Sequence, residues 1–344
     1  MIQGNINNLL GKLHSAGDRL PFFVTWELTY RCQNRCVHCY QMEMEKVNSE
    51  VCTSDVIQTL NELKNGGTLH VTFSGGDPFI RSDFMYILEE SRRIGLDVSV
   101  FTSGQQIDEE KASILSRINV STVEVTFLGS DANMHNKLAG NKFSFERLTN
   151  TITVLNTYGV KIIAKYVLMK DNYNQLEEFI NLCAKYHIAY KIDNTLYDPW
   201  NANGIIKHLQ LSDEQIYDYI CNFVDIRPRD KGPVMCNAGY LQAGITPTGD
   251  IVPCNVYGNK VVFGNIKSIS FKEAWYGPQA IWFRENYKNG YIVKKECGVC
   301  ECKEYCNLCH GFGYALEKGQ YQHICKMSMI KKKIYEKNEN ITSI

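Results

Sequence analysis

Between about residues 22 and 193, short apolar runs alternate regularly with amphipathic segments, and few folds accommodate such a chain. The apolar runs are typical of buried strands, whereas the segments between them repeat apolar residues at helical spacing. Ser54, for example, precedes Ile57 and the apolar positions of residues 60–63, as expected of a capped helix. Strand–helix alternation joins parallel strands through right-handed crossovers, so we predict one curved α/β sheet.

The predicted elements follow one another without internal repeats. Strands are expected at residues 23–29, 69–74, 97–102, 122–128, 160–168 and 189–193. Helices are expected at residues 54–64, 81–94, 109–117, 143–158 and 174–186, with one more at 211–224. We divide the chain into an N-terminal extension (1–21), an α/β part (22–210), a linker and helix (211–231), a Cys-rich part (232–330) and a tail (331–344), which we read as a solvated helix end.

The composition narrows the class of protein. A chain of 344 residues is long enough for one large domain and a smaller one. Lys+Arg and Asp+Glu each number 37, and this balance argues against an electrostatically driven nucleic-acid or membrane-surface partner. Neither a secretory signal nor a membrane-spanning apolar run is apparent in the sequence, so we expect a cytoplasmic protein without a membrane partner.

Three of the 14 cysteines follow the first predicted strand with the spacing C-x3-C-x2-C, namely Cys32, Cys36 and Cys39. They therefore lie at the C-terminal end of a strand, where α/β barrels place their chemistry. In a reducing cytosol such a cluster indicates metal binding or catalysis rather than disulfides. A cubane iron–sulfur cluster normally takes four thiolates, so three leave one iron open for catalysis. A zinc knuckle or a structural cluster is the alternative for this triplet alone.

The loop of residues 32–40 resembles the signature of the radical S-adenosylmethionine (SAM) superfamily. In that family the amino and carboxylate groups of SAM chelate the open iron of a [4Fe–4S] cluster. Reduction then gives methionine and a 5′-deoxyadenosyl radical, which abstracts hydrogen from the substrate. By the same resemblance His38, which precedes the third cysteine, lies beside the adenine. The six strand–helix units resemble the partial (β/α)6, TIM-like barrel of these enzymes, which is open on one side.

The turn after the second predicted strand reads Gly75, Gly76, Asp77, Pro78. Glycines let the backbone approach a ligand closely, and an adjacent carboxylate could receive an ammonium group. Alone, this sequence is an ordinary turn. One strand after the cysteine triplet, it resembles the family motif that binds the amino group of SAM.

Further positions are assigned by resemblance only. Ser103 lies in a turn similar to the family's T-N-G turn, which implies a ribose or substrate contact. Thr126 and Leu168 fall where relatives line the ribose and adenine, although we read both as ordinary barrel residues. Ala139 stands where many relatives have an arginine, so a SAM carboxylate contact from that position is absent or supplied elsewhere.

The C-terminal cysteines resemble the SPASM domain, which binds auxiliary iron–sulfur clusters. The resemblance implies one [4Fe–4S] cluster on Cys297, Cys300, Cys306 and Cys325, and part of a second on Cys236, Cys254 and Cys309. The last spacing of the C-x2-C-x5-C-x2-C run is two residues where the domain usually has three. A fourth ligand of the second cluster is not obvious, although Cys302 is a candidate, and this cluster could be incomplete, open to substrate or absent.

Alternatives remain for the C-terminal cysteines. The four thiolates of the C-x2-C-x5-C-x2-C run would also suit zinc. The remaining cysteines, Cys52, Cys183 and Cys221, are expected to be buried small hydrophobic residues.

The order of these features implies a radical SAM enzyme that modifies a ribosomally made peptide, giving a crosslink, a thioether, an epimer or an oxidised residue. Implied partners are a precursor peptide, a separate leader-recognition protein and an electron donor such as flavodoxin or ferredoxin. One alternative is oxidation or decarboxylation of a small molecule or tetrapyrrole. Another is sulfatase maturation, for which Asp198 or Asp250 could supply a carboxylate. A different class is a non-catalytic iron–sulfur or zinc protein for electron transfer or interaction.

Overall fold

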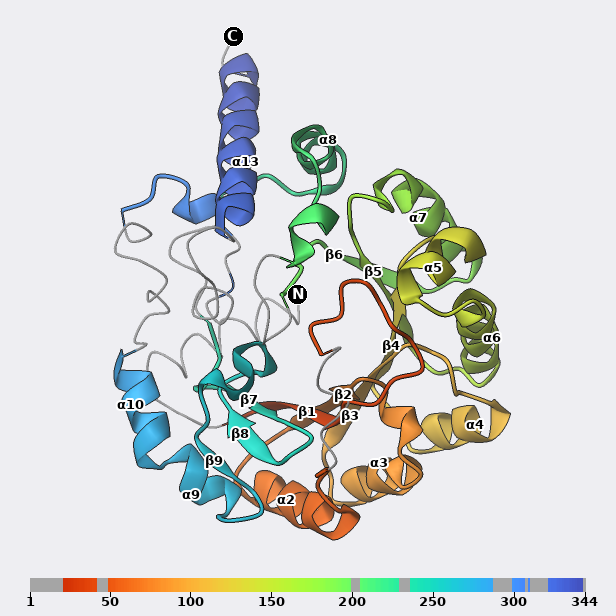
Figure 1. Cartoon of the computed structure of the whole chain (residues 1–344), viewed down its shortest axis with the longest axis vertical. Helices are drawn as coiled ribbons and strands as arrows, with labels where there is room; N and C mark the ends of the chain where they lie inside the picture. The colour runs from red at the N-terminus through yellow and green to blue at the C-terminus, as the bar shows by residue number, and fades with distance from the viewer. Residues whose placement is uncertain are drawn as a thin grey trace.

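The fold is built on one continuous sheet. The computed structural model describes residues 21–41, 49–198, 205–228, 236–286, 299–306, 309 and 321–342. Within these residues the strands form a sheet in the order β6-β5-β4-β3-β2-β1-β7-β8-β9 (Figure 1). The first six strands pair in parallel: β1 (Phe23–Thr29), β2 (His70–Gly75), β3 (Asp97–Thr102), β4 (Thr122–Phe127), β5 (Ile162–Val167) and β6 (Ala189–Asp193).

Helices cover the outer face of this curved sheet, as the ring of helices in Figure 1 shows. They are α2 (Thr53–Asn65), α3 (Phe84–Arg93), α4 (Glu109–Arg117), α5 (Ala132–Ala139), α6 (Ser144–Thr157) and α7 (Leu176–Lys185). The predicted partial α/β barrel is therefore confirmed. Two details differ from the prediction: a short 3-10 helix at Pro78–Ile80 precedes α3, and α5 was not predicted.

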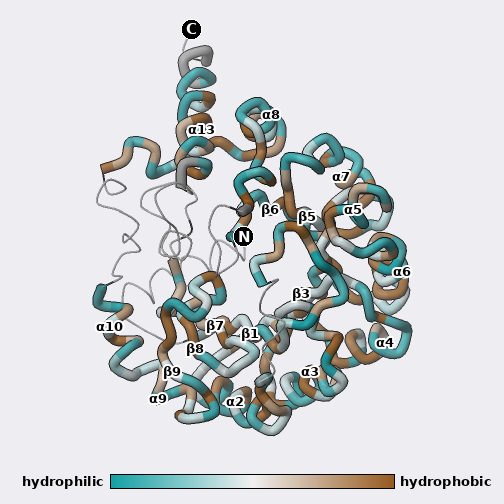
Figure 2. The backbone as a smooth tube through the Cα atoms, viewed as in Figure 1, coloured by the Kyte–Doolittle hydropathy of each residue, from teal (hydrophilic) through white to brown (hydrophobic). Residues whose placement is uncertain are grey.

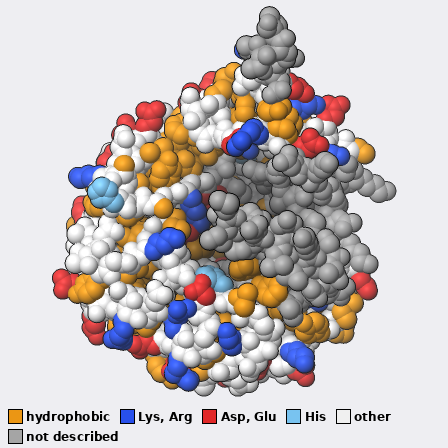
Figure 3. Space-filling view, turned by 180° about the vertical axis from the view of Figure 1, so that it is seen from behind, with side chains coloured by type: hydrophobic (Ala, Val, Ile, Leu, Met, Phe, Trp, Pro, Cys, Tyr) orange, Lys and Arg blue, Asp and Glu red, His pale blue; other side chains and the backbone are white. Residues whose placement is uncertain are grey.

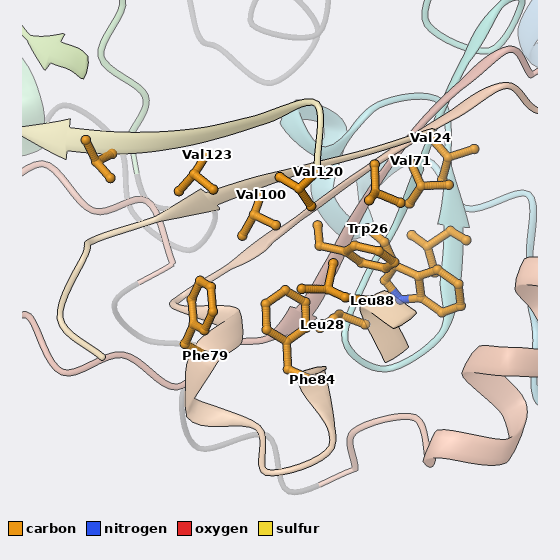
Figure 4. Packing of buried hydrophobic residues seen from close by; sticks show 14 of the residues in the cluster. Val24, Trp26, Leu28, Val71, Phe79, Phe84, Leu88, Val100, Val120 and Val123 are labelled. Carbon is orange, nitrogen blue, oxygen red and sulfur yellow. The ribbon is translucent and has the colours of Figure 1, made fainter. Parts of the chain in front are cut away.

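The core lies between the sheet and the helices. Figure 2 shows that the outer helices carry both apolar and polar segments, as helices with one buried side do. Figure 4 shows Trp26 and Leu28 of β1 packed with Leu88 and Phe84 of α3, and all four side chains are buried. The ring of Phe84 meets that of Phe79 edge to face, with 5.0 Å between centroids, which is a favoured aromatic geometry.

The C-terminal part of the chain extends the same sheet. Strand β7 (Gln242–Ile245) pairs in parallel with β1, and β8 (Asp250–Val252) and β9 (Gly264–Asn265) follow as antiparallel neighbours. Helices α9 (Phe271–Trp275) and α10 (Pro278–Asn286) pack on this end, and the buried Trp275 and Phe283 join the main core. The Cys-rich region, which has little sequence periodicity, thus continues the architecture of the barrel.

Two further helices lie beside each other near the end of the parallel series. The predicted helix at 211–224 is observed as α8 (Asp213–Phe223), which begins with a capping box formed by Ser212 and Gln215. The last helix, α13 (Tyr321–Thr342), runs across the expected start of the tail at residue 331 and contacts α8 (Figure 1). Lys331 is buried, so this stretch is not wholly solvated as the sequence suggested. Among the described residues, every helix is too short or too polar to cross a bilayer.

Candidate functional site

A cavity of about 390 Å³ lies on the inner side of the parallel strands. Each of the six parallel strands contributes to its wall, as do the loop that carries the first three cysteines, the segment after β6 and the segment after Cys254. Seen from behind in Figure 3, the described part of the surface carries both acidic and basic side chains.

The loop after β1 is held by backbone bonds to the end of α5. The N–H groups of Arg35 and Val37 donate to the carbonyls of Ala139 and Leu138 at 2.8 and 3.0 Å. The buried Asn34 donates from Nδ2 to Ser144 Oγ at 3.1 Å at the start of α6. Ala139 thus contributes its carbonyl group to the position of the loop.

Two glycines bring the turn after β2 against the same loop. A Cβ atom on Gly75 would lie 2.2 Å from the carbonyl oxygen of Thr29, and one on Gly76 would lie 2.3 Å from that of Arg31. Real Cβ atoms do not approach oxygen so closely, so only glycine fits at these positions. Both glycines line the cavity, which leaves their backbone accessible to a ligand.

Asp77 is buried and hydrogen-bonded within the protein. Its buried carboxylate accepts hydrogen bonds from Thr102 Oγ1 at 2.9 Å, from Ser103 Oγ at 2.5 Å and from the N–H of Phe79 at 3.1 Å. Burial nevertheless raises the pKa of this carboxyl group. Asp77 and Pro78 are not among the residues that line the cavity, whereas Ser103 is. The carboxylate therefore ties the β2 turn to the β3 turn.

The thiols of Cys32, Cys36 and Cys39 are half-buried and line the cavity together. Burial, and then the neighbouring Cys32 and Cys39, raise the pKa of Cys36 well above its usual range. Three neighbouring thiols on the wall of one cavity, whose ionised forms would repel one another, fit a cationic iron–sulfur cluster, which cysteines bind in their ionised form. Among the described residues, no group of three or more His, Cys, Asp or Glu side chains has an arrangement that could hold a single metal ion.

A charged group forms the wall next to His38. Lys165 of β5 pairs with Asp193 of β6 at 2.8 Å, and Glu124 of β4 pairs with Lys191 of β6. Burial, followed by Lys165, lowers the pKa of His38 to about 4, so its ring is neutral at pH 7. Its Nδ1 has no hydrogen-bond partner among the described residues. A neutral imidazole in this position could donate or accept a bond, or stack on a planar ligand.

Glu27 is a buried carboxylate between the two groups of cysteines. Its Oε1 accepts a hydrogen bond from Tyr40 at 2.8 Å, while Oε2 lacks a partner in the described part of the chain. Burial raises its pKa to about 7, partly offset by the nearby polar side chains of Tyr40, Asn255 and Gln41. All four residues line the cavity. The sequence held one signal for Glu27, since it is a charged residue inside an apolar strand, but gave none for Asn255.

The cysteines of the second predicted set lie close enough to influence one another's pKa. Burial raises the pKa of Cys236 to about 11 and that of Cys254 to about 12, and Cys309 lies close enough to affect both. The hydroxyl of Tyr197 is hydrogen-bonded to Cys309, and the Tyr197 ring meets the Tyr40 ring edge to face with centroids 6.2 Å apart. Because Tyr40 follows Cys39 directly, the two tyrosines connect the two groups of thiols along the cavity wall.

The segment that carries three of the remaining predicted ligands packs against α13. Lys332 of this helix pairs with Glu301 at 3.0 Å, and the ring of Tyr305 meets that of Tyr335. These contacts hold the segment of Cys300, Cys302 and Cys306 against the helix that carries Cys325. Cys297, the first cysteine of that set, lies outside the described residues.

Several other sequence-based expectations can be compared with the structure. Cys183 is buried as predicted, but the prediction was wrong for Cys52 and Cys221, which are exposed at the start of α2 and on the outer side of α8. Thr126 and Asp198 line the cavity, whereas Leu168 and Asp250 do not. Asp198 is buried and accepts a bond from the N–H of Ile206 at 3.1 Å.

Two family models match this chain. The model of the radical SAM superfamily matches residues 26–183, which contain the cysteine loop and the parallel strands up to β5. A model of an iron–sulfur cluster-binding domain, named SPASM, matches residues 236–309. Proteins with these domains bind a [4Fe–4S] cluster with SAM, and auxiliary iron–sulfur clusters, respectively.

Solved structures share the fold at low sequence identity. SuiB from Streptococcus suis, bound to S-adenosylmethionine, has a TM-score of 0.65 and 19% identity over 88% of this chain and 76% of its own. SuiB bound to the precursor peptide SuiA has a TM-score of 0.65 at 18% identity, over 88% and 75%. The protein anSMEcpe with bound AdoMet and Kp18Cys peptide has a TM-score of 0.69 at 17% identity, over 93% and 99%.

Proposed function

This chain is a radical SAM enzyme with a C-terminal SPASM domain, and on that basis we propose that it modifies a side chain or Cα position of a peptide. The observation that carries the proposal is one cavity whose wall includes Cys32, Cys36 and Cys39 and also neighbours of the second cysteine group, such as Tyr197 and Asn255. Tyr40, next to Cys39, and Tyr197, bonded to Cys309, both face it. A substrate held there would lie between the site of hydrogen abstraction and the predicted auxiliary site.

The residues around the cavity fit the cofactors of this family. We assign Cys32, Cys36 and Cys39 as ligands of the [4Fe–4S] cluster, because their thiols line the same end of the cavity. We assign the backbone of Gly75 and Gly76 to SAM binding, because both glycines line the cavity and their lack of a side chain lets the β2 turn lie against the cysteine loop. When bound, the reduced cluster and SAM supply a 5′-deoxyadenosyl radical, which is the chemistry that the protein itself lacks.

The polar groups of the chain would then orient SAM. His38 offers a neutral ring, and Ser103 is held by Asp77 in a fixed position beside the β2 turn. Such pre-organised contacts reduce the freedom that a bound ligand has to lose. Asp77 acts here as a positioning residue, because its oxygens are already occupied by Thr102, Ser103 and Phe79.

The second and third sets of thiols would hold auxiliary clusters. Cys236, Cys254 and Cys309 would share one, with Cys302 as a candidate fourth ligand, and Cys300, Cys306 and Cys325 would share another with Cys297. The contacts of Lys332 and Tyr335 with the segment of Cys300 and Cys306 support this second set. We propose flavodoxin or ferredoxin as the class of electron donor, and a separate leader-recognition protein as a further partner.

Two arguments favour a peptide over a free small molecule. The cavity of about 390 Å³ lies within the size range of ligand-binding pockets, and we propose that it holds SAM together with part of a longer substrate. In addition, SuiB and anSMEcpe, which share the fold, were each solved with a bound peptide.

Mass spectrometry of small peptides from the native host tests the proposal. Cells with the wild-type enzyme are compared with cells that carry Cys36→Ala, and Cys183→Ala serves as a control because that buried thiol lies away from the cavity. We expect one peptide that loses hydrogens, or one that gains solvent deuterium at Cα, in wild-type and Cys183→Ala cells only. If no peptide differs and a small metabolite accumulates in the Cys36→Ala cells, the small-molecule alternative replaces the peptide.

A further inference from the structure

The parallel series of strands ends at an edge that no described strand covers. β6 (Ala189–Asp193) is the last strand beyond β5, and Ala189, Tyr190 and Lys191 are exposed (Figure 1). The carbonyl of Asp193 accepts a bond from the N–H of Leu168 at 2.8 Å, so the backbone groups of Asp193 point toward β5. Since backbone direction alternates along a strand, the N–H and C=O groups of Tyr190 and Ile192 point to the outer edge. No hydrogen bond to these outward groups occurs among the described residues.

Natural proteins usually protect such an edge, often with a lysine that points outward. The lysine of β6 does not serve this purpose. Lys191 pairs with the buried Glu124 of β4, and its Nζ lies 5.2 Å from the centre of the Phe101 ring of β3. Its side chain is therefore directed across the inner face of the sheet. Within the described ranges, the edge therefore has outward backbone groups available for pairing.

The edge leads directly into the cavity. Asp193, the last residue of β6, lines the cavity, and so do Thr195, Leu196 and Tyr197 that follow it. A chain paired with Tyr190 and Ile192 and continued past Asp193 would therefore reach the cavity within a few residues, since each extended residue spans about 3.3 Å. On the inner side it would meet Lys191 and Asp193, and on the outer side Tyr190, whose ring packs on Phe179 of α7 with centroids 5.9 Å apart.

We propose that an extended segment of the substrate peptide adds to the outer edge of β6 as a further strand. This inference rests on the proposed function and names how its peptide is bound. Hydrogen bonds between the peptide backbone and the backbone of Tyr190 and Ile192 would supply affinity that depends little on the peptide sequence, as in other cases of strand addition. Because Lys191 and Asp193 lie on the inner face beside the edge and Tyr190 on the outer face, we expect a segment with polar side chains on the inner face and apolar side chains on the outer face.

A probe peptide tests the edge without knowledge of the natural substrate. The probe is a fluorescein-labelled decapeptide of alternating threonine and valine with lysine at both ends, and fluorescence anisotropy measures its binding to the full-length, cluster-reconstituted protein. Ile192→Pro removes one outward N–H but no bond to β5, so it is compatible with an edge strand. Ile192→Val keeps that N–H and serves as the matched control.

We expect the dissociation constant of the probe to rise at least tenfold in Ile192→Pro and to change less than twofold in Ile192→Val. A probe with N-methyl groups at alternate positions should bind at least tenfold more weakly to the wild type, and probe binding should slow hydrogen exchange of the Ile192 amide. Equal iron content and circular dichroism of the two variants show that the fold is kept. Where Ile192→Pro alters the fold, the N-methyl probe and the exchange measurement on the wild type decide alone.

Absence of probe binding to the wild type, equal binding to Ile192→Pro, or protection of amides elsewhere would overturn strand addition. These outcomes are separate from those of the proposed function. If host peptides are modified but the probe does not bind at β6, only the proposed binding mode is wrong. If the probe binds β6 but no host peptide depends on Cys36, the proposed reaction is wrong and the edge is a peptide site of another kind.

Discussion

Single residues position this site mainly through buried contacts with other segments of the chain. Asp77 shows this most clearly, because its carboxylate joins the turns after β2 and β3 and does not face the cavity. The glycines beside it allow the turn to touch the cysteine loop. The chemistry of the cavity thus depends on residues that would not themselves contact substrate.

Gly76→Ala should disturb the cysteine loop directly. The new Cβ would lie 2.3 Å from the carbonyl oxygen of Arg31, so the loop must shift. We expect a loss of about 1–3 kcal/mol in the free energy of unfolding, as for other overpacked sites, together with a lower iron content per chain. Gly66→Ala is the control, since its nearest contact would be 3.2 Å and its φ is −80°. Equal iron content and stability in the two variants would contradict this role.

Glu27 should make stability depend on pH. Burial raises its pKa from 4.5 to about 7 in the folded chain. Between these values the folded state holds a proton that the unfolded state has released, so stability falls as the pH rises from 5 to 8. At about 1.4 kcal/mol per pKa unit, this loss is on the order of 3 kcal/mol. Thermal unfolding of the wild type and of Glu27→Gln at pH 5 and pH 8 tests this prediction. Between pH 5 and pH 8 the unfolding midpoint of the wild type should fall further than that of Glu27→Gln. Parallel pH profiles would show that Glu27 does not titrate in this range.

At the scale of elements, the decisive contact is between the cysteine loop and α5 and α6. Two backbone bonds from Arg35 and Val37, and the side-chain bonds of Asn34, hold the loop from this side. The loop therefore has a fixed path that does not rely on its three thiols alone. We infer that the helix ends prepare the loop for its ligand.

Asn34→Ala should weaken this tether. Nδ2 of Asn34 donates to Ser144 Oγ and its Oδ1 accepts from Asn141, and the side chain is buried. Removal leaves buried polar partners unsatisfied, which costs about 1–3 kcal/mol. Asn61→Ala removes an exposed asparagine that bonds to the Ile57 carbonyl and is the matched control. Denaturant unfolding and iron analysis of both variants test this; an effect of Asn34→Ala no larger than that of Asn61→Ala would contradict it.

The parallel strands could be predicted from the sequence, whereas one helix and several residues of the cavity could not. Most of the parallel strands and their helices were predictable because they bury apolar side chains, such as Trp26 of β1 and Phe73 of β2. Helix α5 was missed because residues 132–139 are largely polar and short. Glu27, Lys165 and Asp193 were missed as site residues because their meeting depends on sheet register between strands distant in sequence.

At the scale of the whole molecule, the two cysteine-bearing parts share one sheet. β7 pairs with β1, and residues from both parts line the cavity. The sequence predicted a second part by its cysteines, but strands β7–β9 are short and bear few periodic features. The continuity of the sheet was therefore visible only in the structure.

Truncation tests this continuity. A chain that ends at residue 235 lacks β7, and β1 with its buried Trp26 becomes an exposed edge. We expect this chain to bind a hydrophobic dye and to aggregate, because an unprotected edge strand pairs with other chains. A chain that ends at residue 286 keeps β7–β9, α9 and α10, and should unfold cooperatively. A soluble, cooperative chain of 235 residues would show that the parallel strands are stable without β7.

Production of 5′-deoxyadenosine by the reduced, reconstituted protein tests the central claim most directly, namely that Cys32, Cys36 and Cys39 hold the cluster that cleaves SAM. We expect the wild type to form this nucleoside, Cys36→Ala to remain at background, and Cys300→Ala to retain cleavage without forming modified peptide. Chromatography with mass detection quantifies the nucleoside, and iron analysis of each variant verifies reconstitution. Cleavage of SAM by Cys36→Ala at the rate of the wild type would contradict the account.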